Sequence, residues 1–409
     1  MKRARRAGGI GLALAGRPST FFRSGVPRWA DRVTSGRAMR IMRAMAAVDP
    51  VQPKRLQAPP DESLVAETVR TALPFPARFV KLAPLAGDAS NRRYFRVELS
   101  GAPQASLVLM QLAEPEAFKQ SEEAVSGAVA IAELPFVNVL RHLAKAGVAV
   151  PSLYYYDRAA GLLYLEDLGD VTLAEASANA TGPDTPALYQ RAVDGLVTLH
   201  MKATFPPDPS CLAFSRAFDA PLLMWEFDHF LEYGIEKRRG RLIPEGDRQA
   251  IRAEMQRIAA LMAEQPRVFT HRDYHSRNLM VQHGRIRVLD FQDALMGPAS
   301  YDLASLLRDS YLSLEEEMVE ALIVRYLEGR AKAGAPLDRP VFLRLFDLTS
   351  IQRNLKAAGR FVYIHLVKGN DRYLRYIPHT LANVKRNLNR YRQLHPLRDL
   401  LARYVPELA

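Results

Sequence analysis

Three side chains with the types and spacing needed for phosphoryl transfer lie in the segment VFTHRDYHSRNLMVQHGRIRVLDFQDA, residues 268–294. Asp273 comes first, followed by Asn278 and then by Asp290. Phosphoryl transfer depends mainly on positioning and electrostatics, and a carboxylate can orient the acceptor hydroxyl and accept its proton late. An amide and a second carboxylate offer the hard oxygen ligands that Mg²⁺ prefers. The pattern predicts Asp273 as the catalytic residue and Asn278 and Asp290 as metal ligands.

A β-hairpin must bring these groups together. The apolar runs LMV and IRVLDF flank a turn at His283 and Gly284. Asn278 precedes the first run and Asp290 ends the second, so a hairpin delivers both side chains to the same edge. We expect His271 and Arg272 to be structural residues of the catalytic loop.

Two other interpretations of this segment remain open. Asp, Asn and His are common turn formers at strand ends without any catalytic role. Alternatively, His271, Asp273 and His275 could form the metal site of a hydrolase, although this leaves Asn278 and Asp290 unexplained. In the phosphoryl-transfer interpretation His271 braces the loop by hydrogen bonding, and Asp302 in the following YDLASLL segment has the same structural role.

The order of elements predicts an α+β fold with two lobes, like that of protein kinases. Three β-type runs between Phe79 and Leu112 precede the helical stretch PFVNVLRHLAKAG, which has Pro135 in its first turn and Gly147 as its stop signal. The strand-like runs SLYYYD and GLLYLEDLG follow. We expect a small antiparallel-sheet N-lobe over residues 56–168 and a mainly helical C-lobe over 169–409, with the catalytic hairpin at 268–293. Helices are expected to resume at Tyr301.

Charge is concentrated in the first 50 residues. They hold eleven Lys and Arg residues against Asp31 and Asp49, which is nine of the twelve net positive charges. The remainder has too little clustered positive charge for a nucleic-acid groove. We expect residues 1–55 to be a disordered basic leader, which an upstream start-codon assignment would also explain. The run GGIGLALAG is too short to span a membrane, and the single cysteine, Cys211, suits a reducing cytosol.

Specific motifs connect the chain to a known family. HRDYHSRNLM and VLDFQDALMGPASYDLASLLRD resemble the aminoglycoside phosphotransferase family of kinases. GDASNRRYFRV, LLYLEDLGD and RNLKAAGRF further resemble its bacterial branch of N-acetylmuramate/N-acetylglucosamine 1-kinases, with the likeness covering about residues 65–390. The resemblance implies a cytoplasmic enzyme that uses ATP and Mg²⁺ to phosphorylate the anomeric hydroxyl of an amino sugar in peptidoglycan recycling.

The nucleotide side follows from the same fold. The segment GDASNRR lies between two predicted strands, where small residues let backbone amides approach phosphates, although such residues also form ordinary turns. The strand SLVLMQLA lacks the lysine that protein kinases carry there. Either Arg92, Arg93 or Lys119 supplies its charge, or the magnesium ions suffice, or the protein binds nucleotide poorly, and we favour an arginine. Adenine should contact the backbone near Glu166 and Leu168, in the crossing segment at about residues 166–169 where the chain passes from the small lobe to the large lobe. The candidate nucleotide-binding residues are Gly87, Ser90, Asn91, Arg93, Glu166 and Leu168.

The acceptor side is less well defined. Gln292 and Asp293 follow Asp290, where the acceptor hydroxyls should gather, although Asp293 could instead cap a helix. Trp225 could stack on a sugar or pack in the core, and Arg353 begins a basic tail that suits an acidic sugar or is simply a solvated helix face.

Other functions remain possible for such a site. A kinase of an aminoglycoside, choline or homoserine would use the same loop, and the missing strand lysine also fits a non-catalytic nucleotide-binding module. Protein-kinase activity is disfavoured because no APE-like segment follows DFQ. We expect a small-molecule substrate and neither a nucleic-acid nor a membrane partner.

Overall fold

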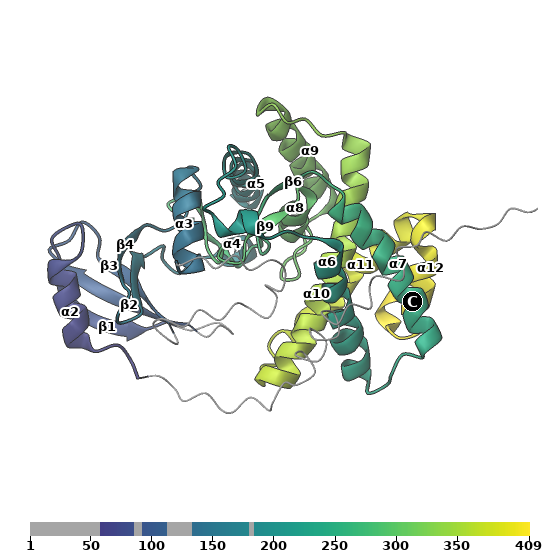
Figure 1. Cartoon of the computed structure of the whole chain (residues 1–409), viewed down its shortest axis with the longest axis horizontal. Coiled ribbons are helices and arrows are strands. Elements are labelled where there is room, and N and C mark those ends of the chain that lie inside the picture. The colour runs from purple at the N-terminus through teal and green to yellow at the C-terminus, as the bar shows by residue number, and fades with distance from the viewer. Residues whose placement is uncertain (1–57, 86–91, 113–132, 180–183) are drawn as a thin grey trace, which may run out of the picture. The chain divides into compact units, whose positions relative to one another are not determined.

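The computed structural model describes residues 58–85, 92–112, 133–179 and 184–409, and the segment Pro60–Ala409 forms one compact unit (Figure 1). The predicted basic leader and the candidate nucleotide residues Gly87, Ser90, Asn91 and Lys119 lie outside the described residues. Among the described helices, none has the length and apolar character needed to cross a membrane.

A five-stranded antiparallel sheet forms the N-lobe. Its strand order is β1-β2-β3-β5-β4, so the two strands that follow α3 (Pro135–Lys145) complete the sheet begun by the first three. Helix α2 (Glu62–Thr71), which the sequence patterns did not predict, packs against this sheet (Figure 1). The predicted order of three strands, a helix and two strands is confirmed. The strands are β1 (Arg78–Pro84), β2 (Arg93–Ser100), β3 (Ser106–Gln111), β4 (Leu153–Asp157) and β5 (Leu162–Glu166).

The two faces of the sheet belong to different cores. Leu107 and Leu109 point to the α2 side, where they pack with Val65 and Val69. Met110, the residue after Leu109, points to the opposite face of the sheet and joins the core shared with α3 and the C-lobe. Alternation along β3 therefore separates an N-lobe core from the interface that faces the catalytic loop.

The predicted hairpin is present in the C-lobe. Strands β7 (Leu279–Gln282) and β8 (Arg285–Val288) pair in antiparallel register. His283 and Gly284 both have positive φ, 49° and 70°, as a tight two-residue hairpin turn requires. The Leu289 amide also donates to the Asn278 carbonyl at 2.9 Å, which extends the pairing to the residues that flank the hairpin.

The sequence patterns did not predict strand β9 (Leu295–Pro298) of the catalytic region. Strand β6 (Arg267–Thr270) pairs with β9, and α8 (Ser300–Leu307) then begins one residue before the predicted position. Two of the four residues of β9 are Gly297 and Pro298, and a glycine followed by a proline is typical of a turn rather than of a strand. Gly297 is required by packing, because a Cβ there would lie 2.8 Å from the Phe218 ring and 2.9 Å from Thr270 Oγ1.

The rest of the C-lobe is helical, as predicted. The 30-residue helix α10 runs alongside α6 and α11 and provides the longest continuous wall of the lobe (Figure 1). The longer helices are α4 (Leu173–Asn179), α5 (Asp184–Lys202), α6 (Ala220–His229), α7 (Glu245–Ala263), α9 (Glu316–Lys332), α10 (Arg339–Lys368), α11 (Ile377–Arg390) and α12 (His395–Ala402). Single 3₁₀ turns occupy Leu212–Ser215, Leu374–Tyr376, Arg392–Leu394 and Pro406–Leu408.

Helix α10 approaches a π-helical segment, Phe230–Lys237, unusually closely. At Gly359 a Cβ would lie 2.8 Å from the Phe230 Cα and 3.2 Å from the His229 carbonyl oxygen. Both neighbours are backbone atoms, which cannot swing aside as a flexible side chain could. Gly359 therefore fixes the distance between α10 and the chain that continues α6.

Replacing Gly359 with alanine should destabilise the protein. Overpacking of this kind costs about 1–3 kcal/mol of unfolding free energy, even though alanine favours helix more than glycine. Gly246→Ala in α7 is the matched control, because a Cβ there meets nothing within 4 Å and should leave stability nearly unchanged. Urea unfolding of both variants measures the difference, and equal midpoints would contradict the packing role of Gly359.

Candidate active site

The catalytic loop is held by one buried carboxylate. Asp302, in the first turn of α8, accepts hydrogen bonds from the backbone amides of His271 at 2.7 Å and Arg272 at 2.9 Å. Arg272 has a φ of 81°, a conformation that residues other than glycine rarely adopt and that costs free energy. The paired amide bonds to Asp302 offset that strain and set the direction in which the chain delivers Asp273.

His271 is fully engaged in the loop. Its Nε2 lies 2.8 Å from the Leu289 carbonyl oxygen, and its Nδ1 accepts from the Asp273 amide at 3.2 Å. Both ring nitrogens are therefore used inside the protein. That leaves neither nitrogen free as a metal ligand, which disfavours the metal-hydrolase alternative.

The loop and the hairpin bring the three predicted functional side chains together. Asn278 Nδ2 donates to the Asp273 carbonyl oxygen at 3.0 Å and lies 3.4 Å from Asp290 Oδ2. Asp290 has a φ of 62°, so its side chain leaves the end of β8 at an angle that a regular strand would not allow. The Asn278 amide thus lies beside both the Asp273 backbone and the Asp290 carboxylate, and the Asp273 carboxylate is close enough to Asp290 to affect its pKa.

The donor set around Asp290 fits a divalent cation. Surrounding protein atoms raise the pKa of Asp290 by desolvating its carboxyl group, and although the Gln292 hydrogen bond lowers it, the negative charges of Asp273 and Asp293 raise it further. Gln292 Nε2 donates to Asp290 Oδ1 at 2.8 Å, and within the described chain the buried Gln292 Oε1 has no hydrogen-bond partner. A hard cation held by Asn278 and Asp290 would relieve this repulsion of carboxylates.

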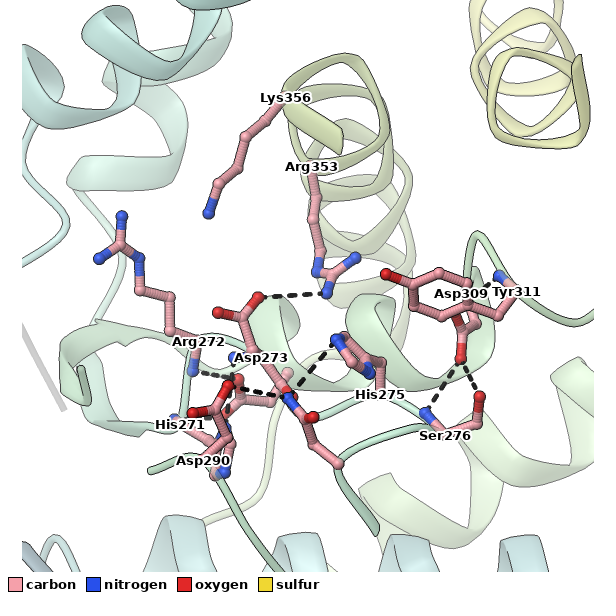
Figure 2. Close-up of polar contacts among 12 residues, drawn as sticks. His271, Arg272, Asp273, His275, Ser276, Asp290, Asp309, Tyr311, Arg353 and Lys356 are labelled. Carbon is pink, nitrogen blue, oxygen red and sulfur yellow. Dashed lines mark hydrogen bonds and ion pairs between the residues drawn. The ribbon is translucent and has the colours of Figure 1, made fainter. Parts of the chain in front are cut away.

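Positive charge surrounds Asp273 on its other side. Burial raises the pKa of the Asp273 carboxyl, but the charges of Lys356, Arg353 and Arg272 outweigh it and hold the pKa well below its usual range. Arg353 Nη2 lies 3.7 Å from Asp273 Oδ1, and Figure 2 shows Arg353 and Lys356 reaching down from α10 toward the loop. Asp273 is therefore ionised and able to accept a hydrogen bond at neutral pH.

Two of these cations, Arg272 and Lys356, are positioned by Glu226 of α6, which is completely buried. Its Oε1 lies 3.0 Å from Arg272 Nη2 and 3.1 Å from Lys356 Nζ, and its Oε2 accepts from Gln352 at 2.8 Å. One carboxylate thus holds a cation of the catalytic loop and a cation of α10. The sequence analysis did not identify Glu226 as a charge partner, because its contacts come from segments about 46 and 130 residues away.

Asp309 braces the opposite end of the loop. Its Oδ2 accepts from both the amide (3.0 Å) and the hydroxyl (2.5 Å) of Ser276, while its Oδ1 accepts from the Tyr311 amide at 2.9 Å. The sequence analysis missed Asp309. It lies two residues beyond the end of α8, where helical spacing no longer applies, so its contact with Ser276 gave no periodic signal in the sequence.

The crossing segment between the lobes is fixed by ion pairs. Arg287 of β8 pairs with Glu166 at 2.7 Å, and Arg96 of β2 pairs with Asp167 at 2.6 Å and Asp170 at 2.9 Å. The Glu166 side chain is therefore engaged with the C-lobe. A cavity of about 480 Å³ lies beside this segment and is lined by Leu168, among others. The use of this backbone for adenine remains a prediction.

The two described arginines near the candidate phosphate loop point to different faces of the sheet. The Arg93 guanidinium lies 5.0 Å from the centroid of Phe95, which belongs to the core under α2. Arg92 lies 5.9 Å from the centroid of Phe136, and Phe136 packs against Phe291, the residue after Asp290. This placement favours Arg92 over Arg93 as the replacement for the missing lysine.

The remaining acceptor-side candidates divide into two groups. Arg353 and Asp293 lie close enough to the catalytic carboxylates to affect their pKa values. Asp293 precedes β9 rather than a helix, so the alternative role as a helix cap is wrong. Trp225 stacks on His229 at 5.8 Å and packs against the helical core, and its substrate role remains a prediction.

Comparisons with known proteins show a family and several relatives that the chain resembles. The model of the family described as "Phosphotransferase enzyme family" (APH) matches residues 81–336. An N-acetylmuramate/N-acetylglucosamine kinase of Neisseria meningitidis is 34% identical over 334 residues, which cover 81% of this chain and 92% of that protein. A protein of the same name from Caulobacter vibrioides is 31% identical, covering 73% of this chain and 85% of its own length.

Solved structures show a similar fold at low sequence identity. A choline kinase from Cryptosporidium parvum has a TM-score of 0.54 and 14% identity, with 83% of this chain and all of the other covered. The aminoglycoside phosphotransferase APH(2'')-IIa in complex with gentamicin has a TM-score of 0.53 and 13% identity, covering 80% of this chain and 97% of the other. At such identities the likeness extends to the two-lobed fold alone.

Replacing Glu226 with glutamine should destabilise the protein by about 3–5 kcal/mol, because it removes the buried carboxylate that pairs with Arg272 and Lys356. Glu67→Gln is the matched control, since the Glu67–Arg70 pair on α2 is exposed and such pairs contribute at most about 1 kcal/mol. Chemical denaturation of the two variants tests this contrast. A loss below 1 kcal/mol in both would show that Glu226 does not carry the charge balance of the site.

Proposed function

Because the chain belongs to the phosphotransferase enzyme family, it is a small-molecule kinase, and we propose that it transfers the γ-phosphoryl group of ATP to the anomeric hydroxyl of N-acetylmuramate or N-acetylglucosamine. The product is the sugar 1-phosphate. The observation that supports the proposed reaction is the proximity of Asp273, Asn278 and Asp290: Asn278 Nδ2 donates to the Asp273 backbone carbonyl at 3.0 Å and lies 3.4 Å from Asp290 Oδ2.

Each side chain has a separate task in this reaction. Asp273, kept ionised by its cationic neighbours, accepts a hydrogen bond from the anomeric hydroxyl, orients it toward the phosphorus, and takes its proton late in the transfer. Asn278 and Asp290 would hold Mg²⁺, which would neutralise charge on the phosphate oxygens. Asn278 is suited to this because its Nδ2 is turned to the Asp273 carbonyl, which leaves Oδ1 as the ligand atom.

The amino-sugar acceptor is supported by the relatives and by the charge of the site. Proteins that are 31–34% identical over most of the chain carry the name N-acetylmuramate/N-acetylglucosamine kinase. Arg353 and Lys356 flank Asp273, and such a site repels cationic acceptors such as choline or an aminoglycoside. Since ATP is the phosphoryl donor, we place the enzyme in the cytoplasm, where it would serve the recycling of cell-wall sugars.

Asp273→Asn should reduce kcat by at least about 10³-fold, because the amide cannot take the proton of the acceptor hydroxyl. Asp399→Asn, at an exposed position of α12, is the matched control and should retain full activity. ADP release measures turnover, and circular dichroism verifies that both variants are folded. An Asp273→Asn enzyme with near-normal kcat would overturn the assigned role.

The acceptor and the position of transfer can be tested together. The purified protein with ATP and Mg²⁺ should form ADP with N-acetylmuramate or N-acetylglucosamine, and ³¹P NMR should show an acid-labile anomeric phosphate. The matched 1-deoxy sugars, which lack the anomeric hydroxyl, should not react. Phosphorylation of a 1-deoxy sugar would contradict anomeric transfer, and activity with choline or an aminoglycoside alone would replace the proposed acceptor.

A further inference from the structure

Two arginine side chains meet beside the catalytic loop without a carboxylate between them. Arg277, which immediately precedes Asn278, donates to the Tyr376 hydroxyl at 3.3 Å, and Arg375 donates to the same oxygen at 2.7 Å. In the described part of the chain, neither guanidinium has an acidic partner within ion-pair distance. Two like charges that share one neutral oxygen repel each other, so the pair favours an anion.

Arg277 is held rigidly for such a ligand. Its guanidinium carbon lies 4.3 Å from the ring centroid of Tyr311, 5.4 Å from that of Tyr376 and 5.9 Å from that of Tyr373. Tyrosine faces attract a cation but leave the in-plane N–H donors of the guanidinium directed outward. The hydroxyls of Tyr376 and Tyr311 engage part of its five donors, and the rest of the planar fork retains the capacity to bind a carboxylate.

The three tyrosines around Arg277 (Tyr311, Tyr373 and Tyr376), here called the tyrosine cage, are connected to the loop that carries Asp273. Tyr311 packs against His275 at 5.2 Å between ring centroids, and His275 is two residues from Asp273. Figure 2 shows Tyr311 beyond His275, on the side of the loop where Arg353 descends from α10. Asp309 ties both Tyr311 and Ser276 to the same carboxylate, so the cage and the catalytic loop form one hydrogen-bonded unit.

We propose that Arg277, supported by Arg375, binds the carboxylate of the acceptor sugar and so makes the enzyme prefer N-acetylmuramate over N-acetylglucosamine. This inference rests on the proposed function and deepens it. The two sugars differ by the lactyl group, whose carboxylate is the only ionised group of the acidic sugar. The guanidinium fork of Arg277 matches a carboxylate in shape and charge, whereas N-acetylglucosamine offers it only a hydroxyl.

The test compares both sugars in the full-length enzyme carrying Arg277→Gln. We expect kcat/KM for N-acetylmuramate to fall about 10- to 100-fold, the effect of losing a charge-assisted hydrogen bond, while kcat/KM for N-acetylglucosamine changes less than threefold. Arg277→Lys should recover part of the preference. Arg241→Gln is the matched control, because it also removes an arginine that lies against a tyrosine ring, 5.7 Å from the centroid of Tyr404. It should leave both values unchanged.

Two outcomes would overturn the inference. An equal loss with both sugars would show that Arg277 only braces the loop, and a rise in the KM for ATP with an unchanged sugar preference would assign it to the nucleotide phosphates. Calorimetry with each sugar alone separates this inference from the proposed reaction. If neither sugar were phosphorylated but Arg277→Gln selectively weakened N-acetylmuramate binding, the reaction would be wrong and the carboxylate site would stand.

Discussion

The catalytic loop depends on the two hydrogen bonds that Asp302 accepts from the amides of His271 and Arg272. These bonds hold Arg272 in a strained backbone conformation, and that conformation turns the next residue, Asp273, toward the cations of α10. The opposite end of the loop is held in the same way, by Asp309. Two buried carboxylates from one short stretch of chain therefore fix the loop that supplies the catalytic side chains.

Negative and positive charges lie on opposite sides of Asp273. On one side, Asp290 is accompanied by Asp273 and Asp293, a concentration of negative charge suited to a cation. On the other side, Arg353 and Lys356 create positive potential where an acceptor or its phosphorylated product would lie. Asp273 lies between these regions. The fold thus separates the metal-binding half of the site from the half that receives the acceptor, although both are built around one short loop.

Local signals in the sequence were sufficient for the elements that form within a few residues. Pro135 and Gly147 delimit α3, and the His283–Gly284 turn sets the register of the hairpin that aligns Asn278 with Asp290. Strand β9 was missed because its four residues include a glycine and a proline, and its identity comes from pairing with β6. The partners of Glu226 could not be predicted, since they lie on distant segments and meet only after the helices have packed.

Helix α10 links the two ends of the acceptor side, because it carries Arg353 and Lys356 and ends at the left-handed Gly369 before the chain enters the tyrosine-rich turn. A helix advances about 1.5 Å and rotates about 100° per residue. One residue gained or lost between Lys356 and Gly369 would therefore swing Tyr373 and Tyr376 a quarter turn away from Arg277. The site therefore constrains the length of this stretch, whereas a change of length in an exposed loop elsewhere would leave the positions of these side chains unaffected.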